Sequence, residues 1–305
     1  MVDNPPMKTR KTSALFVAGC MFCAMALAED TLYPPINGQE DDKAPTLPGR
    51  PMGNKLFYLP THDEPATPAT WGYRYRQVEL TSKDGTRLHG WWIDSKNKPA
   101  SGTVVFSHGN AGSMGHHLGF VMWLAQAGYD VLIYDYRGYG RSHGSTTRKG
   151  IVEDARAALE YAGNQPAGRD PRIISYGHSL GGAKSVSAIA QGKTNNLRAV
   201  ITDASFASYR EMALIIGGRL AADLVSDELS PVHEVAKISP LPLLIIHGKK
   251  DPVVPFSQGL KLYRAAAKPK TMFRVDGGLH GDSLLRNQGE HRKKMLKWLE
   301  ETLKD

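Results

Sequence analysis

The chain has 305 residues, of which 41% are hydrophobic and 22% are charged, a composition typical of a soluble globular protein. This length suits one large α/β domain or two small ones. The formal net charge is +8, but the basic residues are scattered and are not interleaved with stacking aromatic residues, so no nucleic-acid partner is expected.

The N-terminal 28 residues have the features of an export signal. Three basic residues precede an apolar run at 14–28, which ends Ala-Leu-Ala before Glu29. This arrangement is typical of a cleavable secretory signal, and the run is short for a membrane span. We therefore expect a signal peptide at 1–28, cleaved after Ala28, and an exported protein that is periplasmic or extracellular.

An alternative is a lipoprotein anchored through Cys20, because residues 17–20 also resemble a lipid-attachment motif. The residues that follow stay apolar, whereas a lipoprotein tether is usually polar, so cleavage after Ala28 is favoured. Both cysteines, Cys20 and Cys23, lie inside the predicted signal. A mature chain without thiols could form neither a disulfide framework nor a thiolate metal site.

Residues 29–70 are rich in proline, which predicts an extended arm ahead of a domain at 71–305. In that domain, apolar strand patterns alternate with helical patterns, which indicates a mostly parallel sheet covered on both faces. Eight strands are expected, the first two antiparallel across a Lys-Asp-Gly turn. The predicted strands are 77–81, 87–93, 103–107, 131–134, 173–176, 199–202, 241–246 and 271–275. The predicted helices lie around 123–125 and at 151–162, 183–190, 256–267 and 292–299.

A longer insert, at about 205–239, separates the sixth and seventh predicted strands. It contains the apolar run 212–216. At this position it could form a small lid that shapes the site and excludes water. A packed surface helix without a gating role is the other interpretation, and the pattern does not choose between them.

The segment Gly177-His178-Ser179-Leu180-Gly181 lies between a strand pattern and a helix pattern. A sharp strand-to-helix turn of this kind exposes the serine hydroxyl above a helix N-terminus, and side chains at both glycine positions would clash in so tight a bend. Ser179 is therefore the candidate nucleophile. A second Gly-x-Ser-x-Gly match, at 140–144, lacks this context, so Ser142 is interpreted as a turn residue.

A serine nucleophile needs a base within hydrogen-bond reach and a third group that orients the base. Asp251 and His280 follow the last two predicted strands, where a parallel sheet gathers its functional loops. The chain order Ser179, Asp251, His280 is that of elbow-type hydrolases. Asp203, after the sixth strand, is the rival acid.

Three other histidines are interpreted as structural. His178 lies within the turn, where its side chain is expected to point away from the serine, and His108 and His247 are expected to brace loops. Acyl transfer also requires donors to the developing oxyanion. The backbone N–H groups of Leu180 and Asn110 are the candidates, with Ala111 as the alternative to Asn110.

Five segments together resemble the α/β-hydrolase superfamily, more narrowly its serine-aminopeptidase-like and depalmitoylase-like branch. They are SHGNAG at 107–112, YDYRGYGRSHG at 134–144, GHSLGG at 177–182, LLIIHGKKDPVVP at 243–255 and GGLHGD at 277–282. The resemblance covers about residues 78–303. It implies the α/β-hydrolase fold, a mostly parallel eight-stranded sheet with helices on both faces and a small lid insert.

The resemblance also implies a catalytic triad of Ser179, Asp251 and His280, with Asp135 and Arg137 bracing a loop. One departure is that many relatives have Gly-x-Gly-His before the base, whereas here both glycines precede Leu279.

The expected function is a carboxylesterase-like or thioesterase-like serine hydrolase that forms an acyl-enzyme on Ser179 and needs no metal or organic cofactor. The expected partner is a small-molecule or lipid-like acyl substrate, and association with a membrane surface is left open, as is the oligomeric state. An amidase or peptidase, or a non-catalytic binding protein of the same fold, is the alternative. The serine disfavours dehalogenases and epoxide hydrolases with an aspartate nucleophile.

Overall fold

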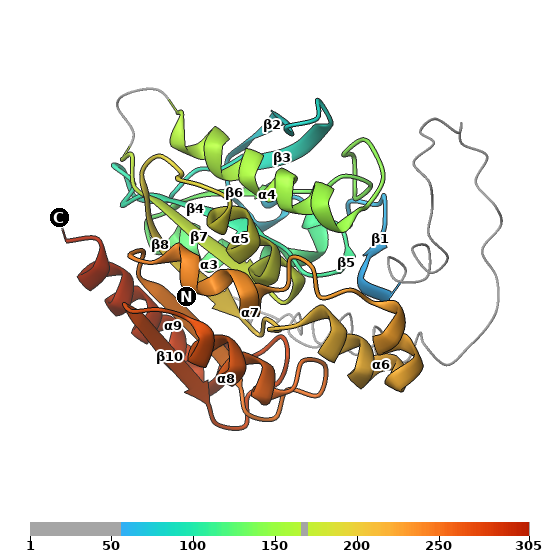
Figure 1. Ribbon diagram of the computed structural model, residues 1–305. Coiled ribbons are helices and arrows are strands. Elements are labelled where there is room, and N and C mark those ends of the chain that lie inside the picture. The colour runs from blue at the N-terminus through green and yellow to red at the C-terminus, as the bar shows by residue number, and fades with distance from the viewer. Residues whose placement is uncertain (1–55, 166–169, 305) are drawn as a thin grey trace, which may run out of the picture. The chain divides into compact units, whose positions relative to one another are not determined.

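The computed structural model describes residues 56–165 and 170–304, which include one eight-stranded sheet of strand order β10-β9-β8-β7-β4-β6-β3-β2 (Figure 1). Strand β3 pairs antiparallel with both β2 and β6, and the other pairs are parallel. The strands are β2 (Tyr75–Thr81), β3 (Arg87–Ile93), β4 (Thr103–Ser107), β6 (Asp130–Tyr134), β7 (Ile173–His178), β8 (Leu197–Asp203), β9 (Leu243–Gly248) and β10 (Lys270–Val275). The predicted mostly parallel sheet of eight strands is confirmed.

Helices cover both faces of this sheet (Figure 1). Side chains alternate along each strand: in β4, Val104 and Phe106 pack in one buried cluster with α3 and α9, and Val105 packs in the other with α4, α5 and α8. The helices are α3 (Met122–Gln126), α4 (Arg148–Gly163), α5 (Leu180–Ala190), α6 (Tyr209–Leu224), α7 (Pro231–Glu234), α8 (Phe256–Ala265) and α9 (Arg286–Thr302), with 3-10 turns η1 (Pro68–Trp71), η2 (Met114–Phe120) and η3 (Val235–Ile238). Because both faces are covered, the inner strands β4, β6, β7 and β9 are buried along their whole length.

The described end of the predicted proline-rich arm belongs to the domain. Phe57 and Tyr58 are buried in the larger core cluster, and the short strand β1 (Leu59–Pro60) pairs in parallel with β5 (Ala111–Gly112). The predicted domain boundary at residue 71 is therefore too late, because these aromatic side chains bury apolar surface. The predicted signal peptide at 1–28, and the rest of the arm up to residue 55, lie outside the described residues.

The insert at 205–239 forms α6, α7 and η3. Its second half is part of the core, since Val235 and Ile238 are buried. Its first half is fixed at the base, where the Asp227 carboxylate accepts hydrogen bonds from the hydroxyls of Ser208 and Ser230. Of the predicted lid, only α6 extends away from the core.

The parallel strands all end at one edge of the sheet, which we call the carboxyl edge. The loops that follow these strands meet there, as is usual for functional sites in open α/β sheets. No helix within residues 56–165 and 170–304 is long and apolar enough to cross a membrane.

Candidate active site

The turn between β7 and α5 holds Ser179 in a strained conformation. Its φ of 54° and ψ of −117° are rare for a residue with a side chain. The flanking glycines are required by close contact: a Cβ on Gly177 would lie 2.4 Å from the amide nitrogen of Gly182, and one on Gly181 would lie 1.9 Å from the Ser107 carbonyl oxygen. The packing of strand, helix and neighbouring loop thus fixes the sharp turn that the sequence predicts.

The structure brings Ser179, His280 and Asp251 together. His280 Nε2 lies 3.1 Å from Ser179 Oγ, and His280 Nδ1 lies 2.8 Å from Asp251 Oδ2. All three residues are buried, from loops after β7, β9 and β10. With a proton on Nδ1, the imidazole donates to Asp251 and can accept the serine proton at Nε2.

The surroundings of Asp251 keep it ionised. Its Oδ1 accepts two backbone hydrogen bonds of 2.9 Å, from the N–H groups of Val253 and Val254. Burial alone would raise the pKa of Asp251, but the hydrogen bond and charge of His280, with the backbone donors, outweigh burial and hold the pKa below its ordinary value. An anionic Asp251 can therefore hold the proton on His280 Nδ1.

Asp203, the rival acid, is buried at the end of β8 and lies 3.4 Å from His178 Nδ1 and from the Tyr176 hydroxyl. Its Oδ1 has no hydrogen-bond partner among the described residues, and burial raises its pKa to about 7. The Asp203 carbonyl oxygen accepts the Ser179 N–H at 2.8 Å. The carboxylate of Asp251 therefore contacts His280 Nδ1, whereas Asp203 supports the turn at Ser179 through its backbone carbonyl.

His178 is closer to the site than the sequence indicates. Its ring lies 5.0 Å from the His280 ring and 4.2 Å from the Phe120 ring, measured between centroids. Burial lowers the pKa of His178 well below its ordinary value, so the ring is neutral. The motif alone could not reveal this contact, because it depends on the packing of the β10 loop and η2.

The other histidines and the second serine motif have structural contacts. His247 Nε2 donates to the Val254 carbonyl oxygen at 2.8 Å, which fixes the loop that carries Asp251. Ser142 donates to the Asp135 carbonyl oxygen at 2.7 Å and accepts the His89 N–H at 2.9 Å. As predicted, Ser142 stabilises a turn.

Arg137 braces the same loop, as the resemblance implies. Its guanidinium bonds the buried Asp154 carboxylate of α4 and also Asp84 in the β2–β3 turn. Asp135 Oδ1 accepts the Met114 N–H at 2.6 Å. These ion pairs and hydrogen bonds connect loops from three strands at the carboxyl edge.

The two candidate oxyanion donors lie on adjoining segments. Leu180 is the first residue of α5, where backbone N–H groups have no partner within the helix. The Asn110 carbonyl oxygen accepts from the Leu59 N–H at 2.9 Å and from the Tyr139 hydroxyl at 2.7 Å, which fixes its loop. The close approach of Gly181 to Ser107 shows that this loop packs against the turn.

No cluster of three or more His, Cys, Asp or Glu side chains suited to a metal ion occurs in the described part of the chain.

An eight-stranded sheet with a strand–serine–helix turn at its carboxyl edge defines the α/β-hydrolase class. The chain matches the family described as serine aminopeptidase, S33, over residues 98–233. It is 36% identical over 249 residues to YfhR of Escherichia coli (strain K12), covering 80% of this chain and 86% of that protein. It is 31% identical to the α/β hydrolase domain-containing protein WAV2 of Arabidopsis thaliana, covering 81% of this chain and 87% of WAV2.

Among solved structures, the Pyrococcus furiosus esterase Pf2001 is similar with a TM-score of 0.68 and 19% identity, covering 81% of this chain and 98% of the esterase. The chain belongs to the α/β-hydrolase family. It is a hydrolase of the broad type that includes esterases and peptidases.

Proposed function

We propose that this protein is a serine hydrolase that cleaves an acyl ester or thioester through an acyl-enzyme on Ser179. The observation that carries the proposal is the continuous contact from Ser179 Oγ to His280 Nε2 and from His280 Nδ1 to Asp251. A binding protein that had lost catalysis would have no need to keep all three groups buried and aligned.

The proposed reaction proceeds in two halves. Ser179 Oγ attacks the acyl carbonyl carbon while His280 Nε2 takes its proton, and the resulting imidazolium is stabilised by Asp251. The proton then passes from Nε2 to the leaving alcohol or thiol, which leaves the acyl group on Oγ. Water then attacks this ester while His280 Nε2 takes its proton, and the proton passes to Ser179 Oγ as the bond between Oγ and the acyl carbon breaks, which releases the acid and restores the serine.

The oxyanion formed in each half reaction needs fixed donors. We assign this role to the backbone N–H groups of Leu180 and Asn110, because the segments that carry them pack together beside Ser179. A donor of this kind commonly contributes about 3 kcal/mol to transition-state stabilisation.

The second candidate function is an amidase or peptidase, which the matched family description favours. An amide differs in its leaving group, since an amine must be protonated by His280 as the bond breaks. Parallel assays with p-nitrophenyl esters, thioesters and p-nitroanilides of the same acyl group separate the two functions. Faster cleavage of the anilide would favour the peptidase.

A fluorophosphonate probe tests the nucleophile. The probe reacts with an activated serine, so we expect mass spectrometry to locate the label on Ser179 and Ser179→Ala to remain unlabelled. Ser142→Ala is a matched control, because Ser142 lies in the same Gly-x-Ser-x-Gly pattern but bonds only to structural groups. Equal labelling of wild type and Ser179→Ala would refute the assignment.

A further inference from the structure

Helix α6 carries an unusual concentration of exposed apolar side chains. Nine large hydrophobic residues are exposed in the described part of the chain, and five of them lie in this helix. They are Leu214, Ile215, Ile216, Leu220 and Leu224, with exposed fractions between 39% and 77%. Single exposed leucines are ordinary, but a contiguous group of this kind marks a surface that meets an apolar partner.

We call residues 214–220 the α6 tip. Its side chains are exposed to solvent on every side of the helix. Leu214, Ile215 and Ile216 are consecutive, and successive helical side chains are rotated by about 100°. All seven residues of the tip are exposed. Gly218, at φ 71° and ψ −167°, interrupts the helix, and a Cβ there would meet nothing within 4 Å. The α6 tip therefore projects from the domain and has no flat apolar face.

The base of α6 is firmly held, so the exposure does not come from a loosely packed segment. The Arg148 guanidinium lies 4.0 Å from the centroid of the buried Tyr209 ring and donates to the Ser226 carbonyl oxygen at 2.6 Å. The Ser208 hydroxyl caps the helix by accepting the Glu211 N–H. Both ends of the helix are thereby fixed to the domain, and the tip extends beyond them.

The α6 tip is connected to the same edge of the sheet as the candidate site. The insert begins at Ser205, two residues after Asp203, whose carbonyl oxygen accepts a hydrogen bond from the Ser179 N–H. Near its base, Glu211 pairs with Lys261 of α8. Leu279, another exposed leucine, immediately precedes His280 at this edge. In Figure 1, α6 lies at the periphery, away from the sheet.

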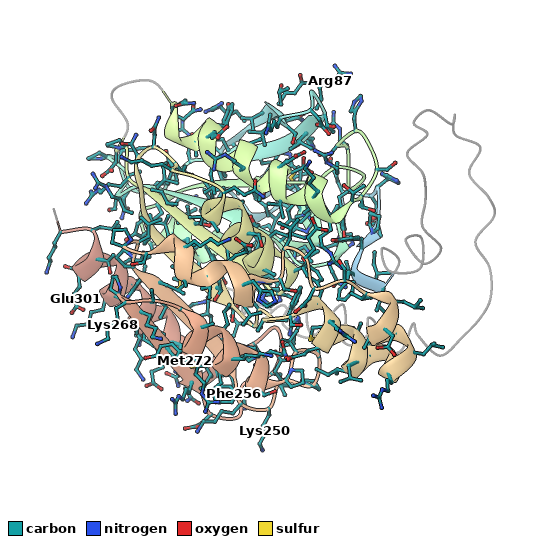
Figure 2. The ribbon with its side chains drawn as sticks, in the orientation of Figure 1. Arg87, Lys250, Phe256, Lys268, Met272 and Glu301 are labelled. Carbon is teal, nitrogen blue, oxygen red and sulfur yellow. The ribbon has the colours of Figure 1, made fainter. Side chains whose placement is uncertain are left out.

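Arg219 is the one charged residue of the α6 tip, and the other charged residues of α6, namely Arg210, Glu211 and Asp223, lie nearer its base. Arg210 and Asp223 pair with each other at 3.0 Å, whereas Arg219, inside the tip, has no ion-pair partner within the described ranges. Lys250, on the loop after β9, has no ion-pair partner there either, and it points outward from a part of the surface that lies apart from α6 (Figure 2). Apolar residues with an unpaired arginine among them match an anionic lipid surface, because arginine reaches the headgroups while its neighbours enter the acyl region.

We propose that the α6 tip inserts into the surface of an anionic phospholipid bilayer. The formal net charge, +8 for the full chain and +6 without the predicted signal at 1–28, adds a general attraction to such a surface. A second copy of this chain fits less well, because a two-fold interface pairs matching patches over about 800 Å² per partner, and side chains that radiate from a short tip cannot form such a patch. Bound in this way, the protein has its carboxyl edge close to the lipid.

Vesicle co-sedimentation tests the proposal with the full chain. Wild type is expected to bind phosphatidylcholine–phosphatidylglycerol vesicles, and more weakly at high salt. Ile216→Glu/Leu220→Glu is expected to lower the partition coefficient at least about ten-fold, since it brings charge into the apolar layer. Leu285→Glu is the matched control, with a similarly exposed leucine outside α6, and it is expected to bind as wild type does.

Two results would overturn the proposal. One is wild type that does not bind these vesicles, and the other is a double variant that binds as tightly as wild type, which would place the contact elsewhere, such as in the apolar run at 14–28. If wild type does not bind vesicles but forms a dimer, and the double variant is monomeric, the α6 tip would be assigned to contact with a second copy of the chain. Ser179→Ala is expected to bind vesicles normally, and the double variant to hydrolyse soluble p-nitrophenyl acetate normally, so docking and catalysis fail separately.

Discussion

Two aspartates at the same sheet edge have opposite protonation behaviour. Asp251 receives two backbone N–H groups and His280, which lower its pKa in spite of burial. Asp203 is buried, its Oδ1 has no hydrogen-bond partner in the described ranges, and its pKa is raised to about 7. Near neutral pH, Asp251 is therefore the carboxylate and Asp203 carries a proton for much of the time. Only Asp251 suits the orientation of an imidazole that becomes positively charged.

Asparagine substitutions at the two positions separate their roles. Asp251→Asn is expected to lower the turnover of p-nitrophenyl acetate on the order of 10³- to 10⁴-fold, because the amide no longer fixes the His280 tautomer or balances its charge. Asp203→Asn resembles the protonated acid and is expected to retain turnover within about ten-fold. Circular dichroism checks that both variants fold. A comparable loss in both would move the acid role toward Asp203.

At the scale of elements, one buried ion pair connects the loop after β6 to its neighbours. Arg137 bonds the Asp154 carboxylate of α4, which is fully buried, and also reaches Asp84 between β2 and β3. A Cβ on Gly150 would lie 2.5 Å from the guanidinium, so the first turn of α4 is shaped around Arg137. The arginine thus joins one sheet edge to one covering helix.

Removing Arg137 is expected to destabilise the fold strongly. Arg137→Ala leaves the Asp154 carboxylate buried without its cation, a change that typically costs about 3–5 kcal/mol of unfolding free energy. Lys149→Ala, which removes an exposed lysine that pairs with Glu153 on the same helix, is the control and is expected to cost at most about 1 kcal/mol. Urea unfolding measures both. Equal shifts in the two variants would contradict a structural role for the buried pair.

At the scale of the whole molecule, a buried lysine joins segments that are far apart in sequence. Lys184 of α5 is fully buried and donates to the Tyr58 hydroxyl at 2.9 Å and to the Arg148 carbonyl oxygen at 3.0 Å. Its ammonium nitrogen lies 5.0 Å from the centroid of the Tyr209 ring. The N-terminal segment, α4 and α6 thus meet around one side chain of the helix that begins after Ser179.

The protonation of Lys184 gives a pH-dependent test of this core. Burial lowers the pKa of Lys184 well below 10.5, so the unfolded chain binds a proton more readily than the folded protein. The contribution of this group to stability therefore rises as pH approaches 10.5 and falls toward neutral pH. In thermal melts, the Tm of Lys184→Met minus the Tm of wild type is expected to be larger near pH 7 than near pH 9. A stability difference independent of pH would refute this account.

Much of the fold follows from local patterns. Apolar runs and their spacing predict the strands, and a Gly-x-Ser-x-Gly turn between a strand and a helix predicts the position of Ser179. Asp251 and His280 follow two later strands of the same parallel sheet, so their loops are predicted to lie at the same edge as Ser179. These features could be predicted because side-chain periodicity and turn sterics act over a few neighbouring residues.

Other features depend on the tertiary structure. Phe57 and Tyr58 lie in a proline-rich stretch, yet they are buried, and His178 contacts the His280 ring in spite of the expected direction. The contrast between Asp251 and Asp203 depends on which backbone N–H groups reach each carboxylate.

The sequence by itself determined the eight strands of the main sheet, most of the helices that cover it and the residues at the strand ends, because these are set by short-range sterics and by apolar periodicity. Burial, hydrogen-bond partners and the projecting α6 tip were decided only by tertiary structure. The physical reason is that solvation and charge at each site depend on atoms contributed by segments that are distant along the chain.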